Sequence, residues 1–300
     1  MSAVRWLLLG AATLGCEQSL EIGYVSKADT TGETDPTHGG AVAASPTRNE
    51  PTALAGTTAL GGAEPTAPAA VAGGGGAAGA ATDDETLWSS SVESGDLSDW
   101  TGDGPVAGGE QLHVATVQAS TDRAHSGRYS AKISFDTSDD DYHWAELFRA
   151  VYGGAAYYSA WFYLEAAHTP AVYWTLSNFF GEANAGDMAT RHGLWDVNLN
   201  ARSLYFYDET SKTFADASPL LTYPIGRWFQ VEILLDYAPP SASHVSVWQD
   251  GTLILDRTNL QSPTEATLYW GIGSQTEQLS PAACTLYIDD VVISRRRVGP

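Results

Sequence analysis

The sequence has few cysteines, few basic residues and no long hydrophobic run beyond its N-terminus. It contains two cysteines, Cys16 and Cys284, and 15 Lys and Arg against 36 Asp and Glu, a formal net charge of −21. A field of that sign repels phosphate backbones and anionic head groups. The composition therefore argues against nucleic acid and strongly anionic polymers as partners. The one basic cluster, Arg295–Arg297, is predicted to be a solvated tail.

Aromatic residues are almost absent from residues 17–84, where Tyr24 stands alone and Gly, Ala, Thr and Pro fill 43 of 68 positions. Such a segment cannot bury enough apolar surface to offset the entropy of ordering it. Residues 85–300, in contrast, hold 9 of the 10 Trp, 13 of the 14 Tyr and all 8 Phe. We therefore predict a disordered tether over 17–84 and one folded domain over 85–300.

The N-terminus has one cation, Arg5, followed by an apolar run from Trp6 to Leu14. This is the form of a secretory signal peptide, and it is too short to span a bilayer as a helix. Thr13-Leu14-Gly15-Cys16 resembles a bacterial lipobox. The resemblance implies a signal peptide over 1–16, lipidation of Cys16, and a protein of the bacterial outer membrane or cell surface that meets the membrane only through its lipid. The alternative is an ordinary signal peptide and a secreted protein.

From Leu87 onward the sequence lacks sustained helical periodicity, and apolar-polar alternation recurs in short runs rich in Val, Ile, Tyr, Trp and Phe. Asp250-Gly251 between two such runs predicts a hairpin with a type I′ turn. Eleven short strands with these spacings predict an all-β antiparallel sandwich. The predicted strands are Tyr129–Phe135, His143–Phe148, Tyr157–Leu164, Val172–Asn178, Leu194–Asn200, Leu204–Tyr207, Trp228–Asp236, His244–Gln249, Thr252–Leu255, Leu268–Gly273 and Thr285–Ile293.

Alternation also assigns side chains to faces, because successive residues of a strand point to opposite sides. Every second residue of Phe229–Leu235, starting at Phe229, is apolar and is predicted to face the core. The same is predicted for Trp195, Val197 and Leu199. Asp196, Asn198 and Asn200 then form a polar row on the other face. We expect that face to combine aromatic rings with amides and carboxylates.

Three segments resemble carbohydrate-binding jelly rolls: Val92–Trp100 their opening strand, Ala124–Ala131 the strand that follows, and Tyr287–Val291 their closing strand. The body between, with Pro224–Trp228 and Val247–Gly251, is similar to larger concanavalin A-like sandwiches, including heparin-lyase-like polysaccharide lyases. The resemblance covers residues 86–294 and implies a jelly-roll sandwich. It favours a carbohydrate ligand, although a fold does not fix a function.

A carbohydrate site needs aromatic rings that stack on sugar C–H faces and polar side chains that bond to hydroxyls. We predict that the domain binds a neutral or weakly charged polysaccharide. For any one aromatic residue, burial in the core is an equally good interpretation. The predicted ligand-binding residues are Trp144, Glu146, Trp161, Tyr163, Asp196, Asn198, Asn200, Tyr205 and Tyr207.

Two other functions stay open. Trp144–Leu147 resembles the Arg-x-Glu-Leu strand of polysaccharide lyases, with Trp in place of Arg. If the protein is a lyase, the catalytic set implied is Glu146, Asn178, His192 and Tyr205, with Tyr207 as an alternative base. A lyase must hold an anionic uronate, and 27 Asp and Glu against 12 Lys and Arg in residues 85–300 disfavour this. The Glu-x-Asp-x-x-Glu strand motif of retaining glucanases is absent. The third candidate is a surface adhesin or structural protein with a protein partner.

The jelly-roll resemblance also implies a structural calcium ion between the first and last strands. Glu93 and Asp289 match the positions of its carboxylate ligands, and calcium suits oxygen donors of this kind. The alternative is that Asp289 and Asp290 are solvated carboxylates at a strand end. No other cofactor is predicted.

Overall fold

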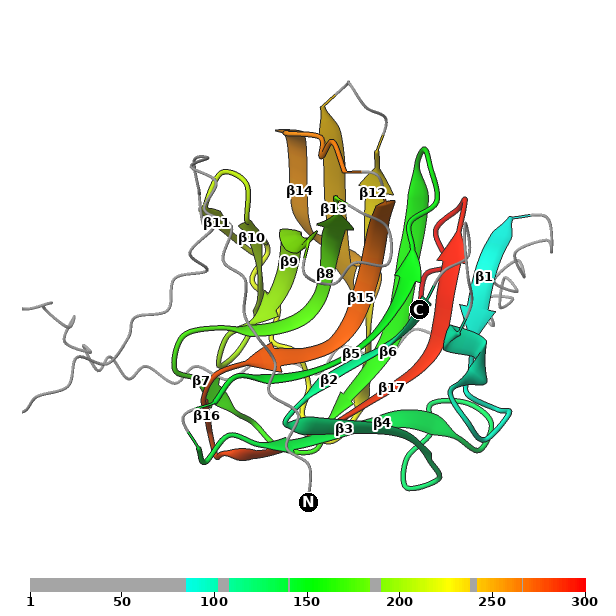
Figure 1. The fold of residues 1–300 in the computed structure, drawn as a ribbon, viewed down its shortest axis with the longest axis vertical. Coiled ribbons are helices and arrows are strands. Elements are labelled where there is room, and N and C mark those ends of the chain that lie inside the picture. Colours follow the sequence, from blue (N-terminus) through cyan, green and yellow to red (C-terminus); the bar gives the residue numbers. More distant parts are fainter. Residues whose placement is uncertain (1–84, 102–107, 140, 184–189, 238–241, 266) are drawn as a thin grey trace, which may run out of the picture. The chain divides into compact units, whose positions relative to one another are not determined.

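The computed structural model describes residues 85–101, 108–139, 141–183, 190–237, 242–265 and 267–300. The predicted signal peptide, Cys16 and the tether over 17–84 lie outside these residues. The described part of the chain folds into two antiparallel sheets that pack face to face as a jelly-roll sandwich (Figure 1). The predicted fold class is therefore confirmed. No helix in the described part is both long and apolar enough to cross a membrane.

The eight-stranded sheet has the order β14-β13-β12-β6-β17-β4-β3, and β1 pairs with β17 beside this path. Its central strands β6, β12 and β17 bring together segments far apart in the sequence. Its strands are β1 (Thr86–Ser90), β3 (Ala115–Ser120), β4 (Ser130–Asp136), β6 (Ala156–Leu164), β12 (Trp228–Asp236), β13 (Ser243–Gln249), β14 (Thr252–Leu260) and β17 (Ala283–Ser294).

The seven-stranded sheet has the order β11-β10-β9-β8-β15-β5-β2. Its strand β15 bends strongly along its length (Figure 1). The strands are β2 (Gly108–His113), β5 (His143–Ala150), β8 (Trp174–Glu182), β9 (Arg191–Leu199), β10 (Leu204–Asp208), β11 (Thr213–Asp216) and β15 (Thr267–Thr276); β7 (Thr169–Pro170) and β16 (Leu279–Ser280) form a separate pair, and η1 (Ser98–Trp100) is a short 3₁₀ helix.

The core lies between the two sheets, and the predicted alternation fills it. Phe229, Val231, Ile233 and Leu235 of β12 are all buried, as are the inward residues of β9. Cys284 is free and buried in the same core, and burial raises the pKa of its thiol. Burial of the apolar side chains on the inward face of each strand is the main force that holds the two sheets together.

Two local predictions had different outcomes. The Asp250-Gly251 hairpin is confirmed, because both residues have positive φ, 47° and 76°. The segment Val92–Trp100 was expected to be the opening strand, and this is wrong. It forms a loop that ends in η1, and the opening strand is β1 just before it. Gly95 (φ 79°) and Val92 (φ 60°) interrupt the extended backbone there.

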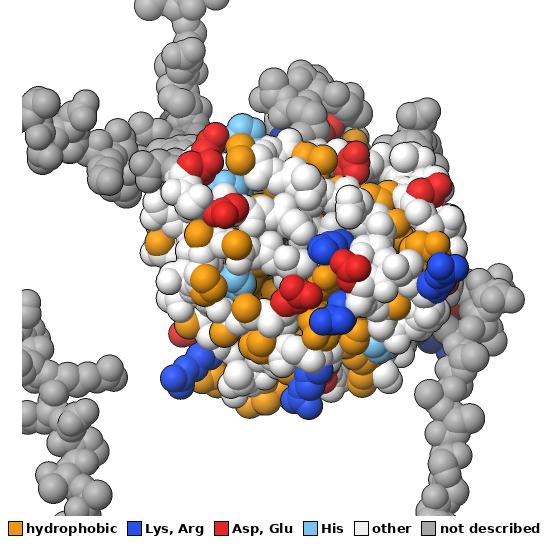
Figure 2. All heavy atoms as spheres, turned by 90° about the horizontal axis from the view of Figure 1, so that it is seen from below, with side chains coloured by type: hydrophobic (Ala, Val, Ile, Leu, Met, Phe, Trp, Pro, Cys, Tyr) orange, Lys and Arg blue, Asp and Glu red, His pale blue; other side chains and the backbone are white. Residues whose placement is uncertain are grey.

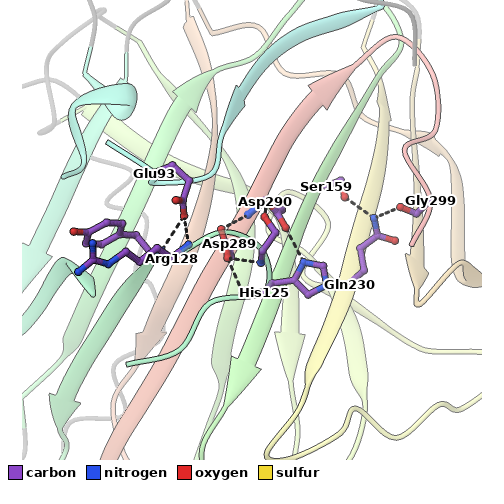
Figure 3. Close-up of polar contacts among 10 residues, drawn as sticks. Glu93, His125, Arg128, Ser159, Gln230, Asp289, Asp290 and Gly299 are labelled. Atoms are coloured by element: carbon purple, nitrogen blue, oxygen red, sulfur yellow. Dashed lines mark hydrogen bonds and ion pairs between the residues drawn. The ribbon is translucent and has the colours of Figure 1, made fainter. Parts of the chain in front are cut away.

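The basic cluster Arg295–Arg297 is exposed, as a solvated tail would be, but the C-terminal residues also bind the eight-stranded sheet at defined positions. Arg297 Nε binds Glu232 Oε2 at 2.9 Å, and the N–H of Val298 donates to Glu232 Oε1 at 2.5 Å. Gln230 Nε2 donates to the carbonyl of Gly299 at 2.6 Å (Figure 3). The buried polar residues of β12 bind this segment, and their binding fixes its position.

Candidate functional site

The outer face of the seven-stranded sheet, which we call the open face, carries most of the predicted ligand-binding residues. On β9 and β10 the register sets Asn198 beside Tyr205 and Asp196 beside Tyr207. Asp196 in turn pairs with Asn178 on β8. Trp144 and Glu146 lie on β5 in the same sheet. On β5, β9 and β10 these residues have the parity opposite to the core residues of their strands, so the sheet gathers them on one surface.

Trp161 and Tyr163 do not belong to this surface. They lie on β6 in the eight-stranded sheet, so the prediction that one face carries them with Trp144 is wrong. Alternation assigns a residue to a face of its own strand and does not say in which sheet the strand lies. There Trp161 stacks on His125 with ring centroids 3.8 Å apart, and Tyr163 packs against Trp228 at 5.5 Å.

Asn200 is a turn residue and is not part of the open face. It follows the last residue of β9, and its Oδ1 accepts the N–H groups of Arg202 and Ser203, both at 2.8 Å. These bonds build the turn that leads into β10. The predicted polar row on β9 therefore has two members on the strand itself, Asp196 and Asn198.

Near the middle of the open face lies an ion pair that sequence reasoning missed. Arg191 Nη2 donates to Glu146 Oε2 at 2.6 Å, and Gln275 Nε2 donates to Glu146 Oε1 at 3.1 Å. The Arg191 guanidinium also lies 3.4 Å from the ring centroid of Phe180 and 4.2 Å from that of Trp144. The Arg191 side chain is only 9% exposed and the Glu146 side chain 3%. The pair is thus held rigidly, and the Arg191 cation is neutralised by its own carboxylate.

Three polar atoms beside this pair have no hydrogen-bond partner among the described residues: Asn178 Oδ1, Arg191 Nη1 and Trp144 Nε1. A Cβ at Gly271 would collide with Glu146 Oε1 and lie 2.5 Å from Asn178 Oδ1. Because Gly271 has no side chain, the Glu146 and Asn178 oxygens can lie over β15 at this point. Buried polar atoms without partners are costly in a folded protein, so atoms gathered in this way suit a polar ligand.

The second feature of the open face is a carboxyl pair. Asp196 is 8% exposed and hydrogen-bonds to Glu209, which follows β10. Burial raises the pKa of Asp196 well above its usual range, and the neighbouring Glu209 raises it further. Burial and Asp196 also raise the pKa of Tyr205 to about 12. Lys212 Nζ donates to Glu209 Oε2 at 2.9 Å, so this glutamate also has a cation beside it.

The edge of the open face carries an aromatic group. Phe214 on β11 stacks on Tyr207 with centroids 4.5 Å apart and lies 6.1 Å from Tyr205. The Phe214 side chain is 68% exposed, the largest exposed aromatic surface among the described residues. Sequence reasoning missed it because the four-residue strand β11 is too short to show alternation.

The catalytic set implied for a lyase is not assembled. Glu146, Asn178 and Tyr205 lie on the open face, but His192 has the opposite parity to Arg191 on β9. Its Nε2 binds Glu265 Oε1 at 2.7 Å. The one predicted histidine is therefore turned away from the other three residues.

Glu93, a predicted calcium ligand, binds the loop between β3 and β4 (Figure 3). Its Oε1 accepts the N–H groups of Arg128 and Tyr129 at 2.7 and 2.8 Å. Gly127 has a φ of 60°, and a Cβ there would collide with the Glu93 carboxylate. The loop is thus shaped around this side chain.

Asp289, the second predicted ligand, reaches the same loop from β17. Its Oδ2 accepts the N–H groups of His125 and Ser126 at 2.7 and 3.2 Å. It is fully buried, and burial raises its pKa to about 6. A hard cation beside it would relieve this penalty, and both carboxylates offer oxygen. No three acidic, His or Cys side chains of the described residues form a metal-binding group, so further ligands would come from the backbone or water.

No protein-family profile matches this chain, and no curated protein matches its sequence. Solved structures resemble its fold. An endo-β-1,4-glucuronan lyase from the fungus Trichoderma reesei is 13% identical, with a TM-score of 0.48 over 62% of this chain and 90% of that one. The cellulose induced protein Cip1 is 19% identical, with a TM-score of 0.47 over 64% and 93%. An alginate lyase of polysaccharide lyase family 7 is 15% identical, with a TM-score of 0.38 over 55% and 77%. Likenesses at this level assign no activity to this chain.

Proposed function

We propose that the open face binds a neutral or weakly charged polysaccharide. The observation that carries this proposal is the group of buried polar atoms without partners, Asn178 Oδ1, Arg191 Nη1 and Trp144 Nε1, beside half-buried aromatic rings. One acceptor and two donors match the hydroxyl groups of a sugar, which both donate and accept. The rings of Tyr205, Tyr207 and Phe214 offer faces on which further sugar units stack.

The charge of the open face favours a ligand without many carboxylates. Arg191 is already paired with Glu146 and Lys212 with Glu209, and Asp196 adds one more acidic group. A polyuronate would meet this excess of acid without a free cation from Arg191. A neutral chain meets no such repulsion.

A glycan array, followed by calorimetry with the best ligand, tests the proposal. Tyr205→Ala and Asn178→Ala should each weaken binding at least tenfold, because they remove a stacking ring and an unpaired acceptor. Trp161→Ala is the matched control, since it removes an aromatic residue from the other sheet and should leave the Kd unchanged. Equal losses in all three variants would refute the site. An array without any binding, with and without calcium, would favour a protein partner instead.

We also propose a structural calcium ion held by Glu93 and Asp289. It would tie the β3–β4 loop to β17. Thermal unfolding with calcium and with a chelator tests this: the Tm should rise with calcium in the wild type and not in Glu93→Gln. A wild-type Tm that changes neither with calcium nor with the chelator would refute the proposed calcium ion.

Export and a lipid anchor at Cys16 are proposed from the resemblance to a lipobox. Fractionation of producing bacterial cells should find the wild type with the outer membrane and Cys16→Ser in soluble fractions. Wild-type protein recovered without lipid in the medium would instead establish an ordinary signal peptide and secretion.

A further inference from the structure

One continuous row of paired residues crosses the open face from β5 to β10, at right angles to the strands. Each member is the register partner of the next member on the neighbouring strand. Directly paired residues of antiparallel strands point to the same face of the sheet, so these side chains lie side by side. The set, which we call the cross-strand row, consists of Trp144, Gln275, Thr175, Asn198 and Tyr205.

The middle of the cross-strand row is a fixed, uncharged polar floor. Thr175 Oγ1 donates to Asn198 Oδ1 at 2.7 Å, and the two residues are only 3% and 2% exposed. Gln275 Nε2 donates to Glu146 Oε1, and Gln275 Oε1 accepts the Tyr142 hydroxyl at 3.2 Å. These bonds hold the amides and the hydroxyl in place. No member of the row carries a charge, so a neutral chain can lie over the floor without repulsion.

The two ends of the cross-strand row carry aromatic rings that stay partly accessible. Trp144 and Tyr205 are both half-buried. The Arg191 guanidinium lies 4.2 Å from the ring centroid of Trp144, and the Phe214 ring lies 6.1 Å from that of Tyr205. These neighbours hold both rings in position, so little side-chain entropy is lost when a ligand stacks on them. The row therefore offers two stacking positions separated by the polar floor.

The strand order sets the separation of the two rings. From β5 the sheet continues through β15, β8 and β9 to β10, which makes four strand spacings. These amount to roughly 19 Å between the strand axes. A 1,4-linked pyranose unit advances an extended sugar chain by about one such spacing. Sugars that stack on Trp144 and Tyr205 are therefore four units apart, and a chain needs five units to reach both rings.

The cross-strand row also continues beyond both rings. Trp144 pairs with His113 on β2, and Tyr205 pairs with Asp216 on β11. These are the outermost strands of the sheet, and both side chains are exposed. A sugar chain that lies over the row can therefore extend past each ring. This geometry suits the interior of a long chain rather than its end.

We infer that the open face binds the interior of a linear, uncharged polysaccharide that lies across the strands, with Trp144 and Tyr205 stacking on sugar units four apart. Once one ring holds the chain, the second contact is intramolecular and gains from a high effective concentration. A chain of four units or fewer reaches only one of the rings. This inference rests on the proposed polysaccharide binding and adds the direction of the chain and its minimum length.

Calorimetry with β-1,4-linked glucose, xylose and mannose oligosaccharides of two to seven units tests the inference. In the series that binds, the Kd should fall roughly fivefold or more between four and five units, because the fifth unit gains the second ring. Trp144→Leu removes the ring but keeps an apolar side chain beside Arg191. It should abolish this step and leave the short oligosaccharides bound at the Tyr205 end. The polymer should bind at least as tightly as the six-unit oligosaccharide.

Phe148→Leu is the matched control. Phe148 lies on the same strand and the same face as Trp144 but outside the cross-strand row, where it packs against Tyr269 with ring centroids 5.5 Å apart. This variant should keep the step between four and five units. A step that survives Trp144→Leu, or that is lost in Phe148→Leu, would overturn the assignment of Trp144 and the direction of the chain.

The remaining outcomes separate this inference from the proposed function. A Kd that stops falling at two or three units would overturn the contact with two rings and leave polysaccharide binding intact. A polymer that binds more weakly than the six-unit oligosaccharide would mean that the site recognises a chain end. Absence of binding by every oligosaccharide and by the polysaccharides of the glycan array would refute the proposed function itself.

Discussion

The buried carboxyl of Asp196 makes stability depend on pH in a direction that can be worked out. Its pKa is raised, first by burial and then by Glu209. The folded protein therefore keeps a proton that the unfolded chain has released. The stability from this group is complete below the unfolded pKa of about 3.9 and is lost as the pH rises through the folded value.

Asp196→Asn should therefore stabilise the protein at neutral pH, because the amide cannot ionise in its buried position. Urea unfolding at pH 7 should give a higher midpoint than the wild type, and the gain should shrink as the pH falls toward about 4. Asp256→Asn should do the opposite, since hydrogen bonds from His244 and Ser246 lower the pKa of Asp256. The loss of stability in Asp256→Asn should be present at neutral pH and should fade as the pH falls. A pH-independent gain for Asp196→Asn would show that ionisation is not its cause.

Individual site residues could be predicted where a strand is long enough for its sequence to show which side chains alternate toward the core. Asp196 and Asn198 were found because Trp195, Val197 and Leu199 mark the core side of β9. Arg191 was not found. Its place beside Glu146 depends on β8 and β15 lying between β9 and β5, a strand order that no local pattern contains.

At the scale of elements, the C-terminal segment 295–300 supplies the charge partner of a buried carboxylate. The Glu232 side chain is 0% exposed, and Arg297 together with two backbone N–H groups binds it. Arg297→Ala should lower the free energy of unfolding by about 3 kcal/mol, because it leaves a buried carboxylate without its cation. Urea denaturation measures this.

The neighbouring Arg296 provides the control for that prediction. It pairs with Glu85 at 2.7 Å, but its side chain is 76% exposed. Exposed pairs contribute about 0–1 kcal/mol, so Arg296→Ala should have at most a small effect. Equal effects from the two substitutions would mean that the segment acts only by covering the sheet, and not through the Glu232 pair.

Whether a strand could be predicted from the sequence depended on its length and its position in the sheet. All eleven predicted strands overlap strands of the structure, because each is rich in branched apolar and aromatic residues. Alternation alone does not explain this, since β8 is buried on both faces and β14 is an edge strand. The strands that were missed are the edge strands β2, β3 and β11, the outlying β1, and the two-residue β7 and β16. Gly108 and Gly109 in β2, for example, offer no apolar parity to detect. Edge strands carry half-exposed side chains, and their pattern is correspondingly weak.

At the scale of the whole molecule, the short alternating runs and their spacing predicted the sandwich but not which strands share a sheet. Eight of the fourteen strand pairings among the described residues join strands that do not follow one another in the chain, as when β6 pairs with both β12 and β17. This is why Trp144 and Trp161, similar in local pattern, lie in opposite sheets. The aromatic set predicted for one ligand surface is therefore divided between two.

The net charge of the whole chain determines how ligand binding should depend on salt. The net charge is −21, yet on the face seen in Figure 2 acidic and basic side chains lie interspersed among hydrophobic ones. A neutral polysaccharide gains nothing from the long-range field, so its Kd should change less than about twofold between about 0.01 and 1 M salt, where the Debye length falls from about 30 to 3 Å. A polyuronate should instead bind more tightly as salt screens the repulsion. Calorimetry over this range measures both, and neutral-ligand affinity that falls steeply with salt would mean that the ligand carries charge recognised by a cation such as Arg191.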